Sequence, residues 1–184
     1  TYESREAYIA RFREMVRKSL PQVHELDADG SIRSSYSFLD ESQIIVPRFG
    51  YGWGQLTTVL AIDVTGDPAT SVSGFCFQTK GSVETFSSKD SLYVFDTCAN
   101  ETRIMKVSFD TSAGKTTVTP AATGTVQGQF LNQFAASEHD GCLRLVVGNR
   151  SRGSSVIVLE QDGEQLTETG RLDGLARGED LYSV

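Results

Sequence analysis

Residues Phe130–Val147, FLNQFAASEHDGCLRLVV, decide the fold of this chain. Two extended apolar segments flank a polar tip that ends in Asp140-Gly141, a pair that favours a tight turn. The stretch therefore predicts a β-hairpin. Its meaning depends on whether the same pattern occurs elsewhere in the sequence.

The opening strand of this hairpin has counterparts along the chain. Their first residues are separated by 50, 48 and 50 positions, and the segments are Arg33–Tyr36, Val83–Phe86, Leu131–Phe134 and Leu181–Val184. A charged turn follows each of the first three: Asp40-Glu41, Lys89-Asp90 and Glu138–Gly141. A second strand comes next in each copy, at residues 43–47, 91–96 and 142–148. Such a spacing is typical of a tandem repeat of about 50 residues.

Each copy continues with two further strands. The third strands are predicted at residues 57–63, 103–110 and 154–160, and weaker fourth strands at 70–78, 116–123 and 165–172. Four antiparallel strands that recur at this interval are typical of the blades of a β-propeller. An up-and-down sandwich or barrel is the rival all-β interpretation, but it does not explain the constant order of strand types.

The predicted fold class is all-β: a partial β-propeller of about three four-stranded antiparallel blades plus the first strand of a fourth. The blades are expected at about residues 31–80, 81–128 and 129–178, with the next one beginning at 179–184. A partial propeller of about three blades leaves sheet edges with unpaired backbone groups, which other strands or subunits must cover. We therefore expect either further blades or a homo-oligomer in which copies cover one another.

Residues 1–30 differ from the rest. Tyr8, Phe12, Met15 and Val16 recur at helical spacing, Ser4 is a suitable helix start, and Pro21 marks a stop. The pattern predicts one amphipathic α-helix of about four turns that packs against the rest of the fold. A polar connector is expected at residues 24–31.

Composition narrows the function classes. The formal net charge of −7 and the pI near 4.8 argue against a nucleic-acid partner, which would select a basic face. No apolar run is long enough for a membrane span. The chain begins at Thr1 without an initiator Met or a signal peptide, as expected for a piece of a longer protein.

The three cysteines, Cys76, Cys98 and Cys142, form no C-x-x-C pair and therefore predict no metal site. Cys76 and Cys142 lie in apolar strand-like runs, where a free cysteine packs as a small hydrophobe. A bridge between Cys76 and Cys98 remains an open alternative.

Sequence motifs predict no catalytic residue, no metal ligand and no cofactor. The chain has no G-x-S-x-G nucleophile elbow and no phosphate-binding glycine loop. It has two histidines, which is too few for a histidine-rich metal site.

Two stretches are candidates for surface recognition. Glu138, His139 and Asp140 adjoin one turn, where they either bind a cation or transfer a proton, or else serve the turn alone. Tyr51 and Trp53 alternate with glycines in the loop 49–54, so their rings can face a sugar or a peptide, or else cover the fold.

The chain resembles a family of secreted bacterial proteins that carry a β-propeller domain distantly related to WD repeats. The resemblance is carried by residues 4–20, 56–63, 91–95, 104–109, 130–145 and 174–184. It implies export, a location outside the cell or at its surface, and a propeller fold, but it transfers no functional residues. The chain departs from the family pattern at residues 74–78 and 48–55.

We therefore expect a non-catalytic binding or protein-interaction scaffold with a protein or glycan ligand. The alternative is an enzyme, of hydrolase or lyase type, whose site is completed only by the full propeller ring.

Overall fold

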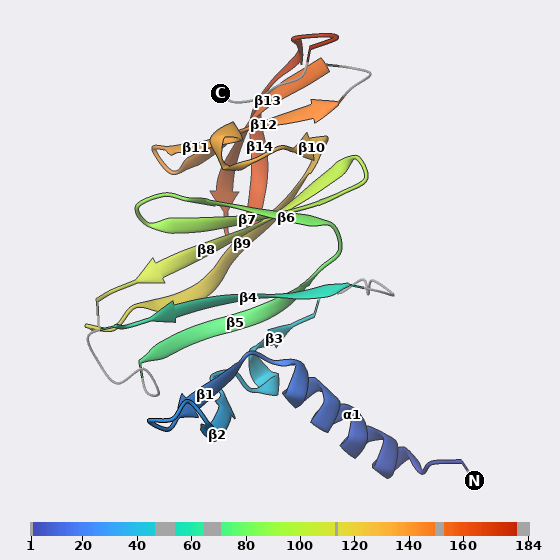
Figure 1. Cartoon of the computed structure of the whole chain (residues 1–184). Coiled ribbons are helices and arrows are strands. Elements are labelled where there is room, and N and C mark those ends of the chain that lie inside the picture. Colours follow the sequence, from blue (N-terminus) through green and yellow to red (C-terminus); the bar gives the residue numbers. More distant parts are fainter. Residues whose placement is uncertain (1, 47–53, 65–70, 113, 150–152, 180–184) are drawn as a thin grey trace. The chain divides into compact units, whose positions relative to one another are not determined.

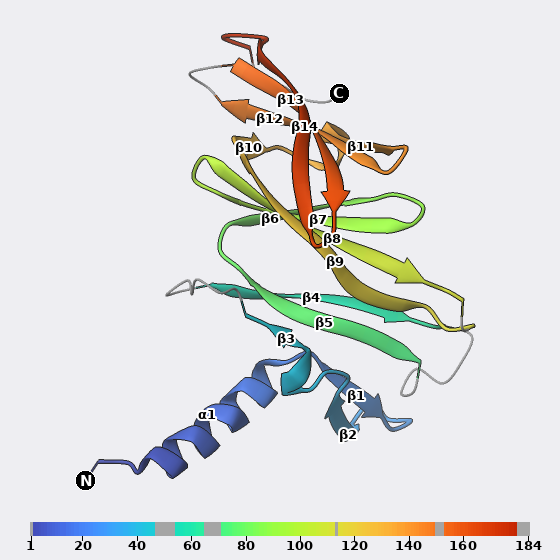
Figure 2. The same ribbon diagram turned by 180° about the vertical axis from the view of Figure 1, so that it is seen from behind.

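The computed structural model describes residues 2–46, 54–64, 71–112, 114–149 and 153–179. Its helices and strands fall into two compact units (Figures 1 and 2). The first unit contains residues 1–50, 56–78 and 111–118, and the second contains residues 51–55, 79–110 and 119–184.

The first unit begins with helix α1 (Arg5–Ser19). The Ser4 hydroxyl accepts a hydrogen bond from the backbone N–H of Ala7 at 3.2 Å, which satisfies one of the free donors of the first turn. Leu20 is extended and Pro21 follows it, so the helix ends where the sequence predicts.

The expectation that α1 packs against the rest of the fold is wrong, because none of its residues is buried. Tyr8, Phe12 and Met15 are among the exposed large hydrophobic residues. Leu20, the residue that caps the C-terminus of α1, is buried in a small cluster with Leu39 and Cys76.

The predicted polar connector is in part a strand. β1 (Gln22–Leu26) pairs antiparallel with β2 (Ile32–Ser37), and the turn between them places Gly30 in the left-handed region at φ +83°. Among the described residues β2 pairs with β1 alone, so the predicted hairpin between β2 and the following strand is not formed.

The first repeat therefore departs from the four-stranded antiparallel order. A short 3-10 helix (Glu41–Gln43) precedes β3 (Ile44–Ile45), which pairs in parallel with β5 (Val72–Thr79). β4 (Gln55–Ile62) is the other neighbour of β5. The three strands form one small sheet.

The second repeat has the predicted four strands in chain order. They are β6 (Ser82–Ser87), β7 (Ser91–Cys98), β8 (Glu101–Asp110) and β9 (Thr117–Gln127). β6 pairs antiparallel with β7, and β7 with β8.

The third repeat confirms the Phe130–Val147 hairpin, with one modification. Its first side is divided into β10 (Gln129–Phe130) and β11 (Ala136–His139) by a 3-10 helix at Gln133–Ala135. Both pieces pair antiparallel with β12 (Cys142–Asn149). β13 (Gly153–Asp162) and β14 (Gln165–Leu175) complete the sheet, and Leu181–Val184 lies outside the described residues.

The main core lies where these two repeats face one another. The rings of Phe95 and Phe130 stack at a centroid distance of 3.8 Å. Fourteen buried residues form this cluster, which we call the inter-repeat core: Tyr93, Phe95, Ile104, Ala122, Val126, Phe130, Ala135, Leu143, Leu145, Val146, Val147, Ile157, Leu159 and Leu166.

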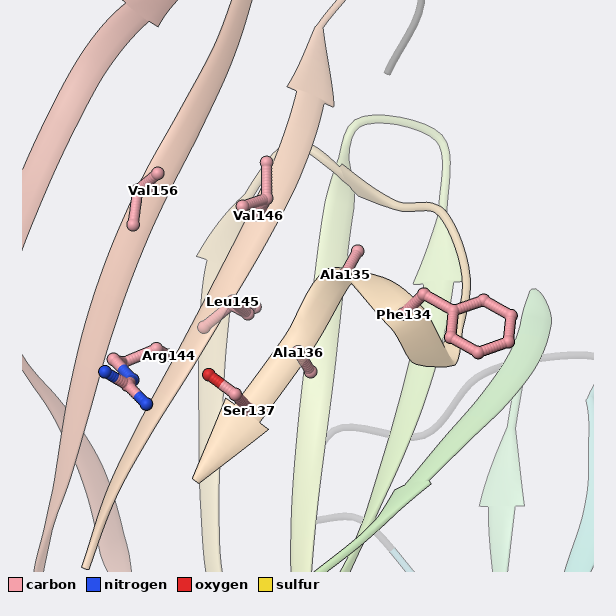
Figure 3. A pocket seen from close by; sticks show the side chains of 8 residues that line it. All are labelled: Phe134, Ala135, Ala136, Ser137, Arg144, Leu145, Val146 and Val156. Carbon is pink, nitrogen blue, oxygen red and sulfur yellow. The ribbon is translucent and has the colours of Figure 1, made fainter. Parts of the chain in front are cut away.

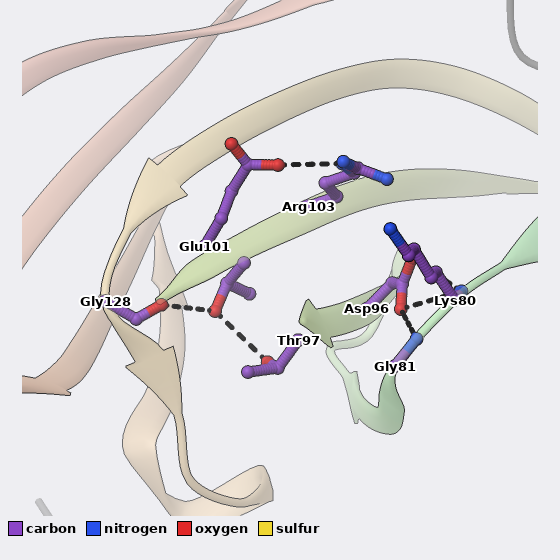
Figure 4. A network of polar contacts seen from close by, with 8 residues as sticks. Lys80, Gly81, Asp96, Thr97, Glu101, Arg103 and Gly128 are labelled. Atoms are coloured by element: carbon purple, nitrogen blue, oxygen red, sulfur yellow. Dashed lines mark hydrogen bonds and ion pairs between the residues drawn. The ribbon is translucent and has the colours of Figure 1, made fainter. Parts of the chain in front are cut away.

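A polar contact fixes the strand that carries Phe130. The buried Thr102 hydroxyl donates to the carbonyl of Gly128, which is labelled in Figure 4, at 2.8 Å. The same hydroxyl accepts from the Phe130 N–H at 3.1 Å. Gly128 has φ +121°, and a side chain there would collide with Val147 at 2.7 Å. These contacts hold β10 in the position that stacks Phe130 on Phe95.

Figure 4 also shows how the second repeat begins. The buried Asp96 carboxylate accepts hydrogen bonds from the backbone N–H groups of Lys80 at 3.1 Å and Gly81 at 2.7 Å. Asp96 therefore orders the chain that leads into β6, which is a structural role.

Candidate functional site

The candidate His139 lies at the end of β11, next to the hairpin turn. Asp140 and Gly141 both have positive φ angles, 50° and 78°, as a two-residue hairpin turn requires. His139 Nε2 lies 3.4 Å from an Asp140 carboxylate oxygen, and both side chains are well exposed, at 66% and 88%. Such an exposed contact has little effect on stability.

The structure separates Glu138 from the other two residues of the predicted cluster. Successive side chains of a strand point to opposite faces, so Glu138 turns inward where His139 turns out. Glu138 pairs across the ladder with the fully buried Leu143. The three residues therefore do not form one site.

Tyr51 and Trp53 lie outside the described residues. Their proposed role in recognition remains a prediction.

Glu138 belongs instead to a buried polar cluster. Its carboxylate Oε1 lies 3.8 Å from Lys106 Nζ, and the two side chains are only 15% and 11% exposed. Lys106 Nζ also lies 5.7 Å from the centre of the Tyr93 ring, within the range of a cation–π contact. Lys106 and Tyr93 are cross-strand partners on β8 and β7, so one face of the second repeat supplies both.

Two atoms of this cluster have no hydrogen-bond partner within the described part of the chain: the Tyr93 hydroxyl and Glu138 Oε2. Burial raises the pKa of Tyr93 above its ordinary value, and the negative charge of Glu138 raises it further. The phenol therefore stays protonated in the folded protein.

Tyr93→Phe tests this description. Removing the buried hydroxyl is expected to change the free energy of unfolding by no more than about 1 kcal/mol at pH 7. Above about pH 10 the unfolded wild-type chain releases the Tyr93 proton whereas the folded chain keeps it, so wild-type stability falls as pH rises. Urea unfolding at several pH values between 7 and 11 should show that the free energy of unfolding falls less at alkaline pH in the variant than in the wild type. An equal fall in the free energy of unfolding at alkaline pH in the two proteins would contradict the raised pKa of Tyr93.

The sequence did not reveal this cluster, although it contained a signal for it. Lys106 stands two positions after Ile104 in an apolar strand, so alternation places both side chains on one face. A cation on the face that buries Ile104 requires an acidic partner. Only the fold shows that this partner is Glu138.

A pocket opens on the opposite face of the third repeat (Figure 3). Its volume is about 290 Å³, and its lining is mainly apolar, with one guanidinium and one hydroxyl. The lining residues are Phe134, Ala135, Ala136, Ser137, Arg144, Leu145, Val146 and Val156.

Strand register explains why these side chains meet. Ser137 on β11 lies directly opposite Arg144 on β12, and Val146 on β12 lies opposite Val156 on β13. Arg144 and Val146 are two positions apart, so they share one face of the sheet. We call this surface, which carries Ser137, Arg144, Val156 and the largely buried Val146, the open face of the third repeat.

Arg144 is the charged group of the open face. Its side chain is exposed and makes no ion pair with any described residue. Figure 3 shows its guanidinium at the edge of the pocket, on the strand beside Ser137. Phe134, from the 3-10 helix, is 63% exposed at the other edge. The arrangement suits a ligand with an apolar part and an anionic group.

Other ligand chemistry finds less support. No group of three or more His, Cys, Asp or Glu side chains that could hold a metal occurs among the residues that the structure describes. Cys76, Cys98 and Cys142 are all free in the structure. Burial raises the pKa of the Cys76 thiol, which makes it less reactive. No described helix is both long and apolar enough to cross a membrane.

Comparison with known proteins gives one match. The family model described as a beta propeller domain matches residues 3–184. No curated protein and no solved structure matches the chain.

Proposed function

Since the chain belongs to the beta propeller domain family, we propose that it is a non-catalytic scaffold that binds a protein partner on the open face of its third repeat. The observation that carries this proposal is the pocket with the unpaired Arg144. Apolar pockets with a few polar groups are typical ligand sites, and arginine and aromatic residues dominate the energetics of many interfaces.

The buried cluster is the strongest candidate for the alternative, an enzyme of the hydrolase or lyase type. Tyr93, Lys106 and Glu138 provide a phenol, an amine and a carboxylate, which are groups that can transfer protons. However, Tyr93 is completely buried in the inter-repeat core, and Lys106 is nearly so. A substrate cannot reach them without separation of the two repeats, so the open face supports binding better than the cluster supports catalysis.

The resemblance to secreted bacterial proteins supports a place of action outside the cell. A binding role there suits a chain of net charge −7, which stays soluble and repels nucleic acid. A glycan ligand at Tyr51 and Trp53 remains the alternative kind of partner.

Selection from a library of constrained peptides tests the proposal. The full chain is the target, and the selected peptides are afterwards tested for binding to the Ser137→Trp variant, in which an indole fills the pocket. Thr167→Trp is the matched control, because Thr167 is an exposed strand residue that does not line the pocket. Circular dichroism confirms that each variant is folded.

The expected result is a set of peptides that bind the wild type and the Thr167→Trp variant but lose at least about tenfold in affinity for Ser137→Trp. A selection that yields only peptides indifferent to Ser137→Trp would overturn the proposed function.

A further inference from the structure

We propose that α1 is a membrane-surface helix, which lies on a bilayer containing anionic phospholipid and places Tyr8, Phe12 and Met15 among the lipid headgroups. This inference goes beyond the proposed function, because no residue of α1 lines the pocket of the open face. Three properties of α1 carry it: the exposure of its apolar residues, the distribution of its charges and its length.

The apolar residues of α1 form one exposed stripe. Tyr8, Phe12 and Met15 are spaced by four and three positions, which places them on the same side of the helix. Their exposed fractions are 52%, 45% and 53%. The rings of Tyr8 and Phe12 stack at a centroid distance of 6.2 Å. The stripe therefore presents a continuous apolar surface that no described element buries.

The charge of α1 is opposite to that of the whole chain. The helix has five cationic and two acidic side chains, a net charge of +3, whereas the chain has a net charge of −7. The remaining residues therefore carry −10. Charges more than about 8 Å apart are largely screened at physiological ionic strength, so the cations of α1 act on the surface that the helix touches. An anionic surface is complementary to this helix.

The cations lie beside the apolar stripe. The Arg11 guanidinium lies 5.3 Å from the centre of the Tyr8 ring, and Arg5 stands three positions before Tyr8. The acidic Glu14 stands two positions after Phe12, a spacing at which helix side chains do not face each other. Long cationic side chains in this position reach lipid phosphates while their methylene groups cover apolar surface.

The ion pairs of α1 leave its cations available. Arg5 and Arg13 are exposed and make no ion pair with any described residue. The other three cations have exposed acidic partners, and such pairs have little effect on stability, so lipid phosphates can replace the carboxylates. These pairs are Arg11 with Glu3, Arg17 with Glu41, and Lys18 with Glu14.

Other partners fit α1 less well. A second copy of α1 would bring two helices of the same charge together, and 15 residues are fewer than the three or more heptads of a typical coiled coil. Three apolar side chains do not supply the area of about 1,000 Å² that a specific protein interface buries. A bilayer accepts a short amphipathic helix without a matching groove.

Co-sedimentation with lipid vesicles tests the inference. The full chain is mixed with sucrose-loaded vesicles of phosphatidylcholine and phosphatidylglycerol in equal amounts, and separately with vesicles of phosphatidylcholine alone. Phe12→Ser removes an aromatic ring from the stripe. Leu56→Ser is its matched control, because Leu56 on β4 is 44% exposed, as Phe12 is at 45%.

A second pair of variants tests the charge. Arg5→Gln/Arg13→Gln removes the two unpaired cations of α1, and Arg33→Gln/Arg177→Gln removes two exposed arginines from elsewhere in the chain. Circular dichroism confirms that each variant is folded.

The wild type should sediment with the mixed vesicles and not with phosphatidylcholine alone. Arg5→Gln/Arg13→Gln should weaken this binding by at least about tenfold, because each cation near an anionic membrane contributes about fivefold. Phe12→Ser should weaken it by about fivefold or more, since an apolar ring leaves the interface. Both control variants should bind as the wild type does.

Three results would overturn the inference: no sedimentation with the mixed vesicles, equal sedimentation with both kinds of vesicle, or equal losses in the test and control variants. Binding to soluble polyglutamate at a salt concentration that abolishes vesicle binding would make an acidic protein the partner of α1 and would also overturn it. The proposed function does not depend on these outcomes, because it concerns a different surface.

Discussion

Phe130→Ala is expected to lower the free energy of unfolding by about 3–5 kcal/mol, the usual range for a buried phenylalanine truncated to alanine. Phe130 is buried, and its ring stacks on Phe95 at 3.8 Å. The stacked pair joins the second and third repeats, and close packing leaves little room for the neighbours to fill the space. The loss in the free energy of unfolding should therefore exceed the amount that corresponds to the buried area of one ring.

Urea unfolding followed by circular dichroism measures this effect, and Phe134→Ala is its matched control. Phe134 lies four positions further along the same segment but is 63% exposed, so its truncation should change the free energy of unfolding by less than about 0.5–1 kcal/mol. Similar losses in the two variants would contradict the position of the inter-repeat core.

Lys106→Met is expected to lower the free energy of unfolding by about 2–4 kcal/mol. This is somewhat less than the effect of removing one partner from a fully buried ion pair. The variant leaves the Glu138 carboxylate 15% exposed with no cation beside it. The double variant Lys106→Met/Glu138→Leu removes both charges and should recover most of the loss, because apolar side chains replace a buried pair well.

The same urea experiment tests this prediction against an exposed pair. Lys18 lies 3.3 Å from Glu14 on α1, and both side chains are more than half exposed. Lys18→Met should change the free energy of unfolding by at most about 0.5 kcal/mol. A double variant that is no more stable than Lys106→Met alone would show that the buried pair is not what the single variant disrupts.

The sequence predicted the second and third repeats well because their patterns are local. Alternation and turn residues fix the hairpin at Asp140-Gly141, and the 50-residue interval relates it to the hairpin at Lys89-Asp90. The family match over residues 3–184 confirms the propeller. The start and end of α1 were also predictable, because Ser4 and Pro21 are local signals.

Long-range pairing explains the failures. β2 has the same pattern as the opening strand of the other repeats, but it pairs with β1, a segment whose polar composition resembled a connector. The apolar stripe of α1 suggested a packed helix, yet a stripe specifies only which face can be buried. It does not specify that another element will cover that face.

The candidate site shows the same division between local and long-range information. From the sequence alone, His139 and Glu138 were similar candidates, because both adjoin one turn. The fold turns Glu138 into the core and leaves His139 exposed. Arg144 was not singled out, because the pocket that it borders is formed only when β11, β12 and β13 come together in the fold.

Methyl NMR spectroscopy tests the central claim most directly, that the open face of the third repeat binds a protein partner. Valine methyl spectra of the full chain are recorded with increasing amounts of a peptide selected for binding to the open face. The account predicts progressive shifts of the Val146 and Val156 methyl signals and an unchanged Val107 signal, since Val107 on β8 is completely buried and does not line the pocket. Shifts that spare Val146 and Val156, or no shifts at all, would contradict it.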